Sequence, residues 1–233
     1  MNGPIGAVYT GKAMSMTSPF AKRFIVALSF LVLPAIPAWA DRSQVYSIQG
    51  VDCATCGEKI RTALKKVKGI KKTEFDIHKV ELTVEMEDTV ADSVVLAAAD
   101  KLGYRAIVGA GQGAYLPKEA YPAGSDVLEL NKDGAAVGPL DKLLVADKFT
   151  VFDVYADWCG PCRDVDKKLR EIVAKRPDVA VRKLSVLDFD SPLAQELGIE
   201  MLPHVIVYTP EGKKTEIHGA ELGKIDKALK KKR

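Results

Sequence analysis

The sequence predicts a protein of the α/β class, with two α/β domains that follow a short leader segment. Apolar residues switch between strand spacing and helix spacing within two separate blocks of the chain. A glycine- and proline-rich stretch without periodicity separates these blocks, and the length of 233 residues suits one to two domains. We therefore expect a leader at 1–40, domains at 41–108 and 126–233, and a linker at 109–125.

The composition is that of a folded chain: 47% of the residues are hydrophobic and 28% are charged, which excludes disorder and a polytopic membrane protein. The formal net charge is +3, but the three bases Lys12, Lys22 and Arg23 lie in the leader, which holds no acid. Removing those three from the 34 bases leaves 31, equal to the 31 acids. A balanced chain is not drawn to polyanions, so we expect no nucleic-acid partner.

The leader has the three parts of a secretory signal peptide. Lys22 and Arg23 precede an apolar run at 24–33, and Ala38-Trp39-Ala40 supplies small residues at the cleavage positions. The run is too short for a membrane anchor, the alternative interpretation, because a spanning helix needs about 20 apolar residues. We expect cleavage between Ala40 and Asp41 and a periplasmic or secreted protein in an oxidising compartment.

The first block predicts a ferredoxin-like sandwich. Its helices end at Gly69 and Gly103, and one of its strands alternates strictly between apolar and charged or polar residues. The expected elements are strands at 45–48, 75–77, 80–86 and 104–108, and helices at 56–67 and 95–102. This order is βαββαβ, which is two βαβ units in about 65 residues.

The second block predicts an α/β domain with a mixed sheet. The expected elements are strands at 150–155, 179–186, 204–208 and 213–217, and helices at 165–173, 191–197 and 222–229. The turn at 210–212 makes the last two strands a hairpin, whereas the earlier strands are separated by helices. Parallel and antiparallel neighbours therefore occur in one sheet.

The motif Trp158-Cys159-Gly160-Pro161-Cys162 stands at a strand-to-helix junction of the second block. Two thiols at this spacing can close a disulfide, and the amides and dipole of a helix N-terminus stabilise the first sulfur as a thiolate. We expect Cys159 to be the exposed attacking thiolate and Cys162 to be the more buried thiol that resolves the mixed disulfide. Half of a zinc site or an inert disulfide is the alternative.

About 105 residues of this block resemble the thioredoxin family, whose active site the motif Trp158–Cys162 matches letter for letter. The resemblance implies the thioredoxin fold and makes Asp153 the buried acid that exchanges a proton with the resolving thiol, although a polar surface position is the alternative. It also makes Lys183 the companion lysine and Pro203 the cis-proline beside the disulfide. His204 departs from the threonine usual after that proline, which leaves the substrate preference open.

A second pair of cysteines, Cys53 and Cys56, lies between a strand and a helix of the first block. Two thiolates that converge on one exposed spot offer a low-coordinate site for soft ions, although they cannot close a tetrahedral zinc site alone. A structural disulfide and a second redox centre are the alternatives.

Residues 44–108 resemble the heavy-metal-associated domain of copper chaperones, mercury-scavenging proteins and metal-pumping ATPases. The resemblance rests on the G-x-x-C-x-x-C loop that starts at Gly50 and on Gly103-Tyr104. It implies a heavy-metal ion at Cys53 and Cys56, with Cu(I) preferred and Tyr104 packed beside the loop. Asp52 replaces the usual threonine and could add an oxygen ligand, so Hg(II), zinc and cadmium stay open.

Together these features predict a periplasmic thiol–disulfide oxidoreductase of thioredoxin type, running as a reductase, that keeps the thiols of its metal-binding domain reduced. The alternative is a carrier or scavenger of copper, mercury, zinc or cadmium with an auxiliary redox domain. No flavin or nicotinamide fingerprint occurs, so we expect no organic cofactor and a membrane thiol-reducing partner as electron donor. Disulfide-bearing proteins, among them its own first domain, are the expected clients, and a metal transporter is a further expected partner.

Overall fold

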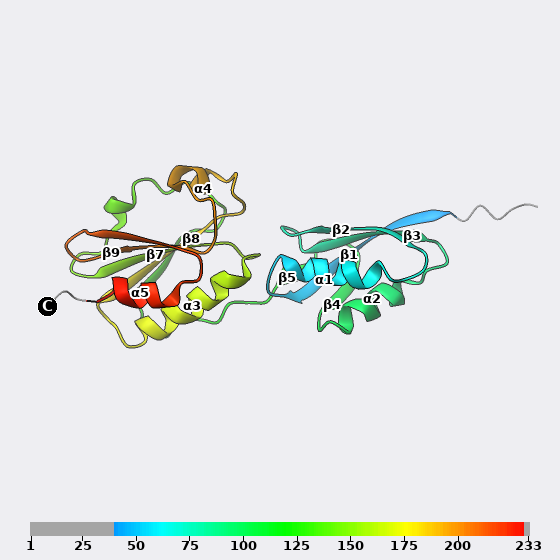
Figure 1. Cartoon of the computed structure of the whole chain (residues 1–233), viewed down its shortest axis with the longest axis horizontal. Helices are drawn as coiled ribbons and strands as arrows, with labels where there is room; N and C mark the ends of the chain where they lie inside the picture. Colours follow the sequence, from blue (N-terminus) through cyan, green and yellow to red (C-terminus); the bar gives the residue numbers. More distant parts are fainter. Residues whose placement is uncertain (1–39, 231–233) are drawn as a thin grey trace, which may run out of the picture. The chain divides into compact units, whose positions relative to one another are not determined.

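The computed structural model describes residues 40–230 (Figure 1). Except for Ala40, the expected signal peptide lies outside these residues, so its cleavage stays a prediction. Among the helices of 40–230, none has the length and apolar character needed to cross a membrane.

The first domain has the predicted βαββαβ order. Its elements are β1 (Asp41–Val51), α1 (Thr55–Leu64), β2 (Ile70–Asp76), β3 (Glu81–Glu87), α2 (Asp92–Asp100) and β4 (Arg105–Val108). The strands lie in the order β2-β3-β1-β4, and all three neighbouring pairs are antiparallel. The strict alternation in β3 has its expected cause, because Leu82, Val84 and Met86 are fully buried. The ferredoxin-like prediction is confirmed.

A short strand extends this sheet into the segment that the sequence assigns to the linker. β5 (Ala114–Tyr115) runs parallel to the end of β1, where Tyr115 is paired with Val51. The Leu116 amide donates to the Val51 carbonyl at 2.7 Å, and the Tyr115 hydroxyl donates to the Ile77 carbonyl at 2.8 Å. The first domain therefore holds the chain as far as Leu116.

The second domain has the predicted mixed sheet, with five strands where the sequence predicts four. Its elements are β6 (Val127–Asn131), η1 (Leu140–Leu143), β7 (Phe149–Tyr155), α3 (Gly160–Val173), β8 (Val179–Ser185), α4 (Pro192–Leu197), β9 (His204–Tyr208), β10 (Lys214–His218) and α5 (Leu222–Ala228). The strand order is β10-β9-β7-β8-β6. β7 is parallel to β8, and β8 to β6, whereas β9 is antiparallel to both β7 and β10. The sequence analysis missed β6 and η1.

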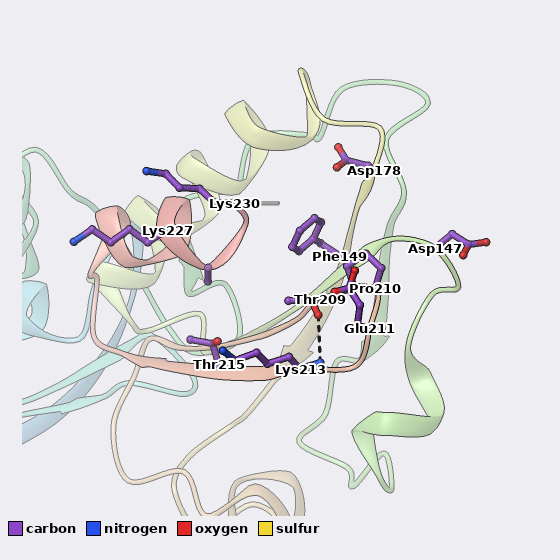
Figure 2. A pocket seen from close by; sticks show the side chains of 11 residues that line it. Asp147, Phe149, Asp178, Thr209, Pro210, Glu211, Lys213, Thr215, Lys227 and Lys230 are labelled. Carbon is purple, nitrogen blue, oxygen red and sulfur yellow. Dashed lines mark hydrogen bonds between the residues drawn. The ribbon is translucent and has the colours of Figure 1, made fainter. Parts of the chain in front are cut away.

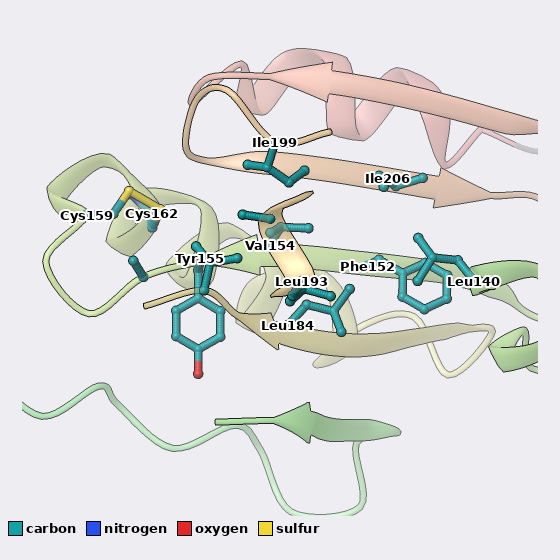
Figure 3. Close-up of a cluster of buried hydrophobic side chains, with 13 residues drawn as sticks. Leu140, Phe152, Val154, Tyr155, Cys159, Cys162, Leu184, Leu193, Ile199 and Ile206 are labelled. Carbon is teal, nitrogen blue, oxygen red and sulfur yellow. A yellow bond between two sulfur atoms is a disulfide. The ribbon is translucent and has the colours of Figure 1, made fainter. Parts of the chain in front are cut away.

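Two buried clusters cover the two faces of this sheet. Phe152 and Val154 face a cluster that includes Leu193 of α4 and the cysteines of the motif (Figure 3). Val151 faces the other cluster, which includes Leu169 of α3 and residues of α5. Every residue of β7 is buried, which explains why this strand reads as a nearly continuous apolar run. The strand can therefore bring one charged side chain, that of Asp153, into the interior.

Candidate redox and metal-binding sites

The cysteine pair of the second domain lies at the N-terminus of α3. Cys159 is the N-cap residue and forms a disulfide with Cys162. The backbone amide of Cys162 donates to the sulfur of Cys159 at 3.2 Å. After reduction, the same amide and the helix dipole stabilise a thiolate at Cys159. The local geometry thus makes Cys159 the better nucleophile of the two.

The burial of this pair differs from the sequence-based expectation. Cys159 is 5% exposed and Cys162 is 3% exposed, so the expected exposure of Cys159 is wrong for the disulfide form. The side chain of Trp158 is fixed next to the pair, because its Nε1 donates to the Leu187 carbonyl at 2.6 Å and its ring packs edge-on against Phe189. Spacing along the chain could not reveal how these side chains enclose the sulfur atoms.

A buried ionic cluster lies beneath the disulfide. Asp153 is fully buried on β7, and the Lys183 ammonium lies 2.8 Å from its Oδ2. Lys183 also lies 2.5 Å from Oδ1 of Asp166, a residue of α3. Burial acts to lower the pKa of Lys183, but the carboxylates of Asp153 and Asp166 outweigh it and raise that pKa. Lys183 therefore stays positively charged between two carboxylates.

One oxygen of this cluster is free to take a proton. Oδ1 of Asp153 is buried and has no hydrogen-bond partner among residues 40–230. Buried polar atoms nearly always have a partner, and the exceptions often mark catalytic groups. The arrangement thus gives Asp153 one oxygen held by Lys183 and one that can accept a proton.

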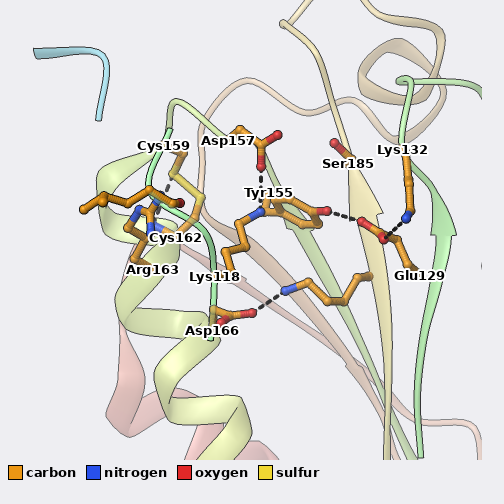
Figure 4. A network of polar contacts seen from close by, with 12 residues as sticks. Lys118, Glu129, Lys132, Tyr155, Asp157, Cys159, Cys162, Arg163, Asp166 and Ser185 are labelled. Atoms are coloured by element: carbon orange, nitrogen blue, oxygen red, sulfur yellow. Dashed lines mark hydrogen bonds and ion pairs between the residues drawn. A yellow bond between two sulfur atoms is a disulfide. The ribbon is translucent and has the colours of Figure 1, made fainter. Parts of the chain in front are cut away.

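Asp166 is the member of this cluster that sequence reasoning missed. It is 3% exposed and also accepts hydrogen bonds from the Tyr121 hydroxyl, at 3.0 Å, and from Arg170. Figure 4 shows Asp166 on the helix that begins at the disulfide. A signal was present, because Asp166 interrupts the apolar stripe of α3 between Val165 and Leu169. An acid on the buried face of a helix needs a cationic partner.

Residues of the expected linker pack against the second domain. The Lys118 ammonium lies 2.8 Å from Asp157 and 3.4 Å from the centroid of the Tyr155 ring (Figure 4). Burial lowers the pKa of Lys118. The second domain therefore holds the chain from Lys118 onward.

The loop before β9 contains the cis peptide that the family resemblance implied, between Leu202 and Pro203. Pro203 is buried, and its carbonyl accepts a hydrogen bond from the Gly219 amide at 2.8 Å. His204 follows as the first residue of β9 and is 3% exposed.

The cysteine pair of the first domain lies at the start of α1. Cys53 is half-buried, Cys56 is buried, and both are free thiols whose sulfur atoms are 3.0 Å apart. The Cys56 thiol donates to Oδ1 of Asp52 at 2.9 Å. The ligand atoms of Asp52, Cys53 and Cys56 all lie within 4.8 Å of one another. Two sulfur atoms and one oxygen thus converge on one point, which fits a soft or borderline cation.

The charges around this pair oppose release of the thiol proton. Burial, and next the hydrogen bond to Asp52, raise the pKa of the Cys56 thiol. The same hydrogen bond is the main reason why the pKa of Asp52 is lowered. Burial and the nearby Cys56 thiol raise the pKa of Tyr104, which therefore lies beside the loop as the resemblance implied. A metal ion has to displace the Cys56 proton before it can bind both sulfur atoms.

A pocket of about 830 Å³ lies at the turn between β9 and β10 (Figure 2), and no residue of the two cysteine sites lines it. Its walls carry charged side chains, among them Asp147, Glu211, Lys213 and Lys227, but no cysteine. His78 is exposed. Thiol and disulfide chemistry is therefore limited to the two cysteine pairs.

Comparisons with known proteins match the two domains separately. The family model "Thioredoxin" matches residues 139–231, and "Heavy-metal-associated domain" matches residues 45–105. Thioredoxin-1 of Schizosaccharomyces pombe is 32% identical over 88 residues, which are 38% of this chain and 84% of that protein. Chloroplastic thioredoxin F2 of Arabidopsis thaliana is 35% identical over 95 residues, 41% of this chain and 50% of that protein.

The first domain is similar in structure to oxidized MerP from Ralstonia metallidurans CH34. That likeness has 23% identity and a TM-score of 0.29, and it covers 30% of this chain and 97% of that chain. The chain spans about half the length of the first curated relatives it matches.

Proposed function

Because the chain belongs to the thioredoxin family through its second domain and carries a heavy-metal-associated domain before it, we propose that it is a self-maintained metal-binding thiol–disulfide oxidoreductase. In this proposal, Cys159 and Cys162 reduce the pair Cys53 and Cys56. One observation carries it: the two pairs are joined by a very short free stretch of chain.

The length of that stretch follows from contacts within each domain. Tyr115 is paired with Val51, two residues before Cys53. Lys118 is bound to Asp157, two residues before Cys159. Three steps of an extended chain, from 115 to 118, span at most about 11 Å. Covalent reach alone therefore limits how far apart the two pairs can move.

A short tether favours electron transfer between the pairs over transfer to free clients. Two groups joined by a short flexible linker meet at an effective concentration of roughly millimolar. An exposed thiol pair in an oxidising compartment tends to form a disulfide, and a disulfide cannot bind a soft cation. The second domain would restore the binding form of the first.

The proposed reaction is a balanced two-electron exchange. The Cys159 thiolate attacks one sulfur of the Cys53–Cys56 disulfide, which forms a mixed disulfide and releases the other sulfur as a thiolate. Asp153 accepts the proton of Cys162 through its free oxygen, and the Cys162 thiolate then attacks Cys159. The first domain leaves as a dithiol, and the second domain holds the Cys159–Cys162 disulfide.

The partners and the metal complete the proposal. A membrane thiol-reducing protein in the periplasm would reduce Cys159 and Cys162 again. Cu(I) is the first choice for Cys53 and Cys56, because thiolates select soft ions. Asp52 adds an oxygen that suits zinc or cadmium, with Hg(II) as a further alternative. A metal transporter would then exchange the ion with this domain.

The variant Cys162→Ser tests the transfer. It cannot resolve the mixed disulfide, so we expect a covalent link between Cys159 and Cys53 or Cys56, identified by mass spectrometry after alkylation and proteolysis. Cys159→Ser is the matched control, because it removes the nucleophile and keeps the fold. If Cys162→Ser traps an external disulfide but never the first domain, the proposal of self-maintenance is wrong.

A second candidate function is metal carriage with an auxiliary redox domain, favoured by the convergence of Asp52, Cys53 and Cys56. The variant Cys159→Ser separates the two. If the redox domain is auxiliary, this variant should keep one equivalent of metal in air, as the intact protein does. If the chain maintains its own metal site, the variant should lose the metal as Cys53 and Cys56 oxidise. Cys53→Ser should lose the metal in either case.

A further inference from the structure

A third cluster of metal-ligating side chains lies on the hairpin of β9 and β10, apart from both cysteine pairs. His204 and His218 are directly paired across the two strands, and their rings meet edge-on with centroids 4.4 Å apart. Glu216 lies two residues before His218 on β10 and so shares its face. The ligand atoms of the three residues lie within 4.8 Å of one another. The chain has only three histidines, and two of them meet here.

One atom of this cluster lacks a partner. The Nε2 atom of His204 is buried and accepts or donates no hydrogen bond within residues 40–230. It lies 3.4 Å from Oε2 of Glu216, and His204 as a whole is 3% exposed. A buried imidazole nitrogen without a hydrogen-bond partner, next to a second histidine and a carboxylate, is a ready metal ligand.

We propose that His204, Glu216 and His218 bind a divalent cation of the zinc class, with water in the fourth position. Two histidines and one carboxylate are a known ligand set for zinc, and tetrahedral ligands at about 2.0–2.1 Å from the ion lie about 3.4 Å apart. The separation between His204 and Glu216 already equals 3.4 Å. Glu216 and His218 are exposed and free to turn, so the third ligand can close without moving the backbone.

Lys214 is the group that competes with the ion, because its ammonium pairs with Glu216. The pairing is solvent-exposed and therefore weak, whereas the ion would also bind two imidazoles. Imidazole and carboxylate ligands select borderline cations, and thiolates select soft ones. The two domains would thus hold different metals. This site does not depend on the proposed function.

The position of this proposed metal site in the fold links it to the loop that contains the cis-proline Pro203. His204 follows Pro203 directly, and the Gly219 amide, next to His218, donates to the Pro203 carbonyl. An ion bound by His204 and His218 would therefore hold β9 and β10 together at the end of the cis-proline loop. The ion would not bind the cysteines.

The test uses the chain from Asp41 onward with Cys53→Ser and Cys56→Ser, kept oxidised so that Cys159 and Cys162 cannot bind metal. Titration with Zn²⁺ in a calorimeter should show one site. Titration with Co²⁺ should give visible absorption bands of a nitrogen- and oxygen-ligated ion, without sulfur charge-transfer bands.

His218→Ala is the decisive variant, because His218 is exposed and its loss should not prevent folding. Removal of a ligand should weaken zinc binding by more than the about 10–100-fold that loss of a supporting residue costs. His78→Ala is the matched control and should change nothing. The proposal fails if the parent protein shows no stoichiometric site, or if His218→Ala binds as tightly as the parent. Equal loss in the His78→Ala protein would also contradict it, since that pattern means adventitious binding to surface histidines.

Discussion

The two cysteine pairs have the same spacing and the same place at the start of a helix, yet their surroundings give them different chemistry. In the second domain, the Cys159 sulfur accepts a hydrogen bond from the Cys162 amide. In the first domain, the Cys56 thiol donates a hydrogen bond to the Asp52 carboxylate. An amide donor stabilises a thiolate, whereas a carboxylate beside a thiol holds the proton on the sulfur.

The difference shows that the C-x-x-C spacing sets only the geometry of the pair. The neighbouring residues decide whether the sulfur attacks a disulfide or binds a cation. In the first domain, the deciding residue is Asp52, immediately before Cys53. In the second domain, the deciding residues lie on three different elements of the fold and are Asp153, Lys183 and Asp166.

Loss of the first cysteine of either pair, Cys159 or Cys53, should give the largest effect. Cys159→Ser should lower turnover of a peptide disulfide on the order of 10³-fold or more, because no other group can replace the attacking thiolate. Cys53→Ser should leave that turnover unchanged and abolish the binding of one Cu(I). Disulfide turnover with dithiothreitol as reductant, together with metal content after gel filtration, measures both. If Cys53→Ser slows turnover of the free peptide as much as Cys159→Ser does, the two pairs do not have separate roles.

The next effect concerns proton transfer. Asp153→Asn should slow resolution of the mixed disulfide by roughly 10²–10⁴-fold, the usual contribution of a positioned acid or base. Single-turnover kinetics should then show the mixed disulfide accumulating, while its formation by Cys159 stays fast. Asp164→Asn is the matched control, because Asp164 is an exposed acid on α3, close in sequence to the same cysteines. Equal slowing of formation and resolution would indicate a structural role for Asp153 instead.

A smaller effect should appear at the metal pair. Both ligands are thiols and the pKa of Cys56 is raised, so binding displaces protons, and affinity should rise about tenfold per pH unit for each proton displaced. Asp52→Asn removes the carboxylate that helps to raise this pKa. Cu(I) affinity at neutral pH should therefore stay equal or increase a few-fold, whereas zinc affinity should fall if the Asp52 oxygen is a ligand. Competition with a chelator across a pH series distinguishes the two. A parallel fall in the affinities for both metals would contradict the sulfur-only site for Cu(I).

Most of the fold follows from local patterns, whereas the site depends on packing between distant segments. The alternation in β3 and the apolar run of β7 place their strands within one or two residues. β5 has two residues, too few for any periodicity, and it forms only because the last residues of β1, past Ser47, are not paired with β3. The roles of Asp153 and Pro203 come from family resemblance and not from spacing. Asp166 stood out as a charge within an apolar stripe, but its partner Lys183 lies on another element.

The smallest effect concerns the free stretch of chain between Tyr115 and Lys118, which connects the two domains. Lys118→Ala removes the contact with Asp157. The next buried contact is that of the Tyr121 hydroxyl with Asp166, because Glu119, which pairs with Arg170, is exposed. The free stretch after Tyr115 should then grow from three residue steps to six. Each doubling of a loop costs about 0.6 kcal/mol, so reduction of the first domain should slow about threefold. Stopped-flow measurement of intramolecular transfer shows this change, while turnover of a free peptide disulfide should not move. Lys132→Ala, which breaks only an exposed ion pair with Glu129, is the control and should alter neither rate. Unchanged transfer in Lys118→Ala would mean that the length of the tether does not limit the encounter of the two pairs.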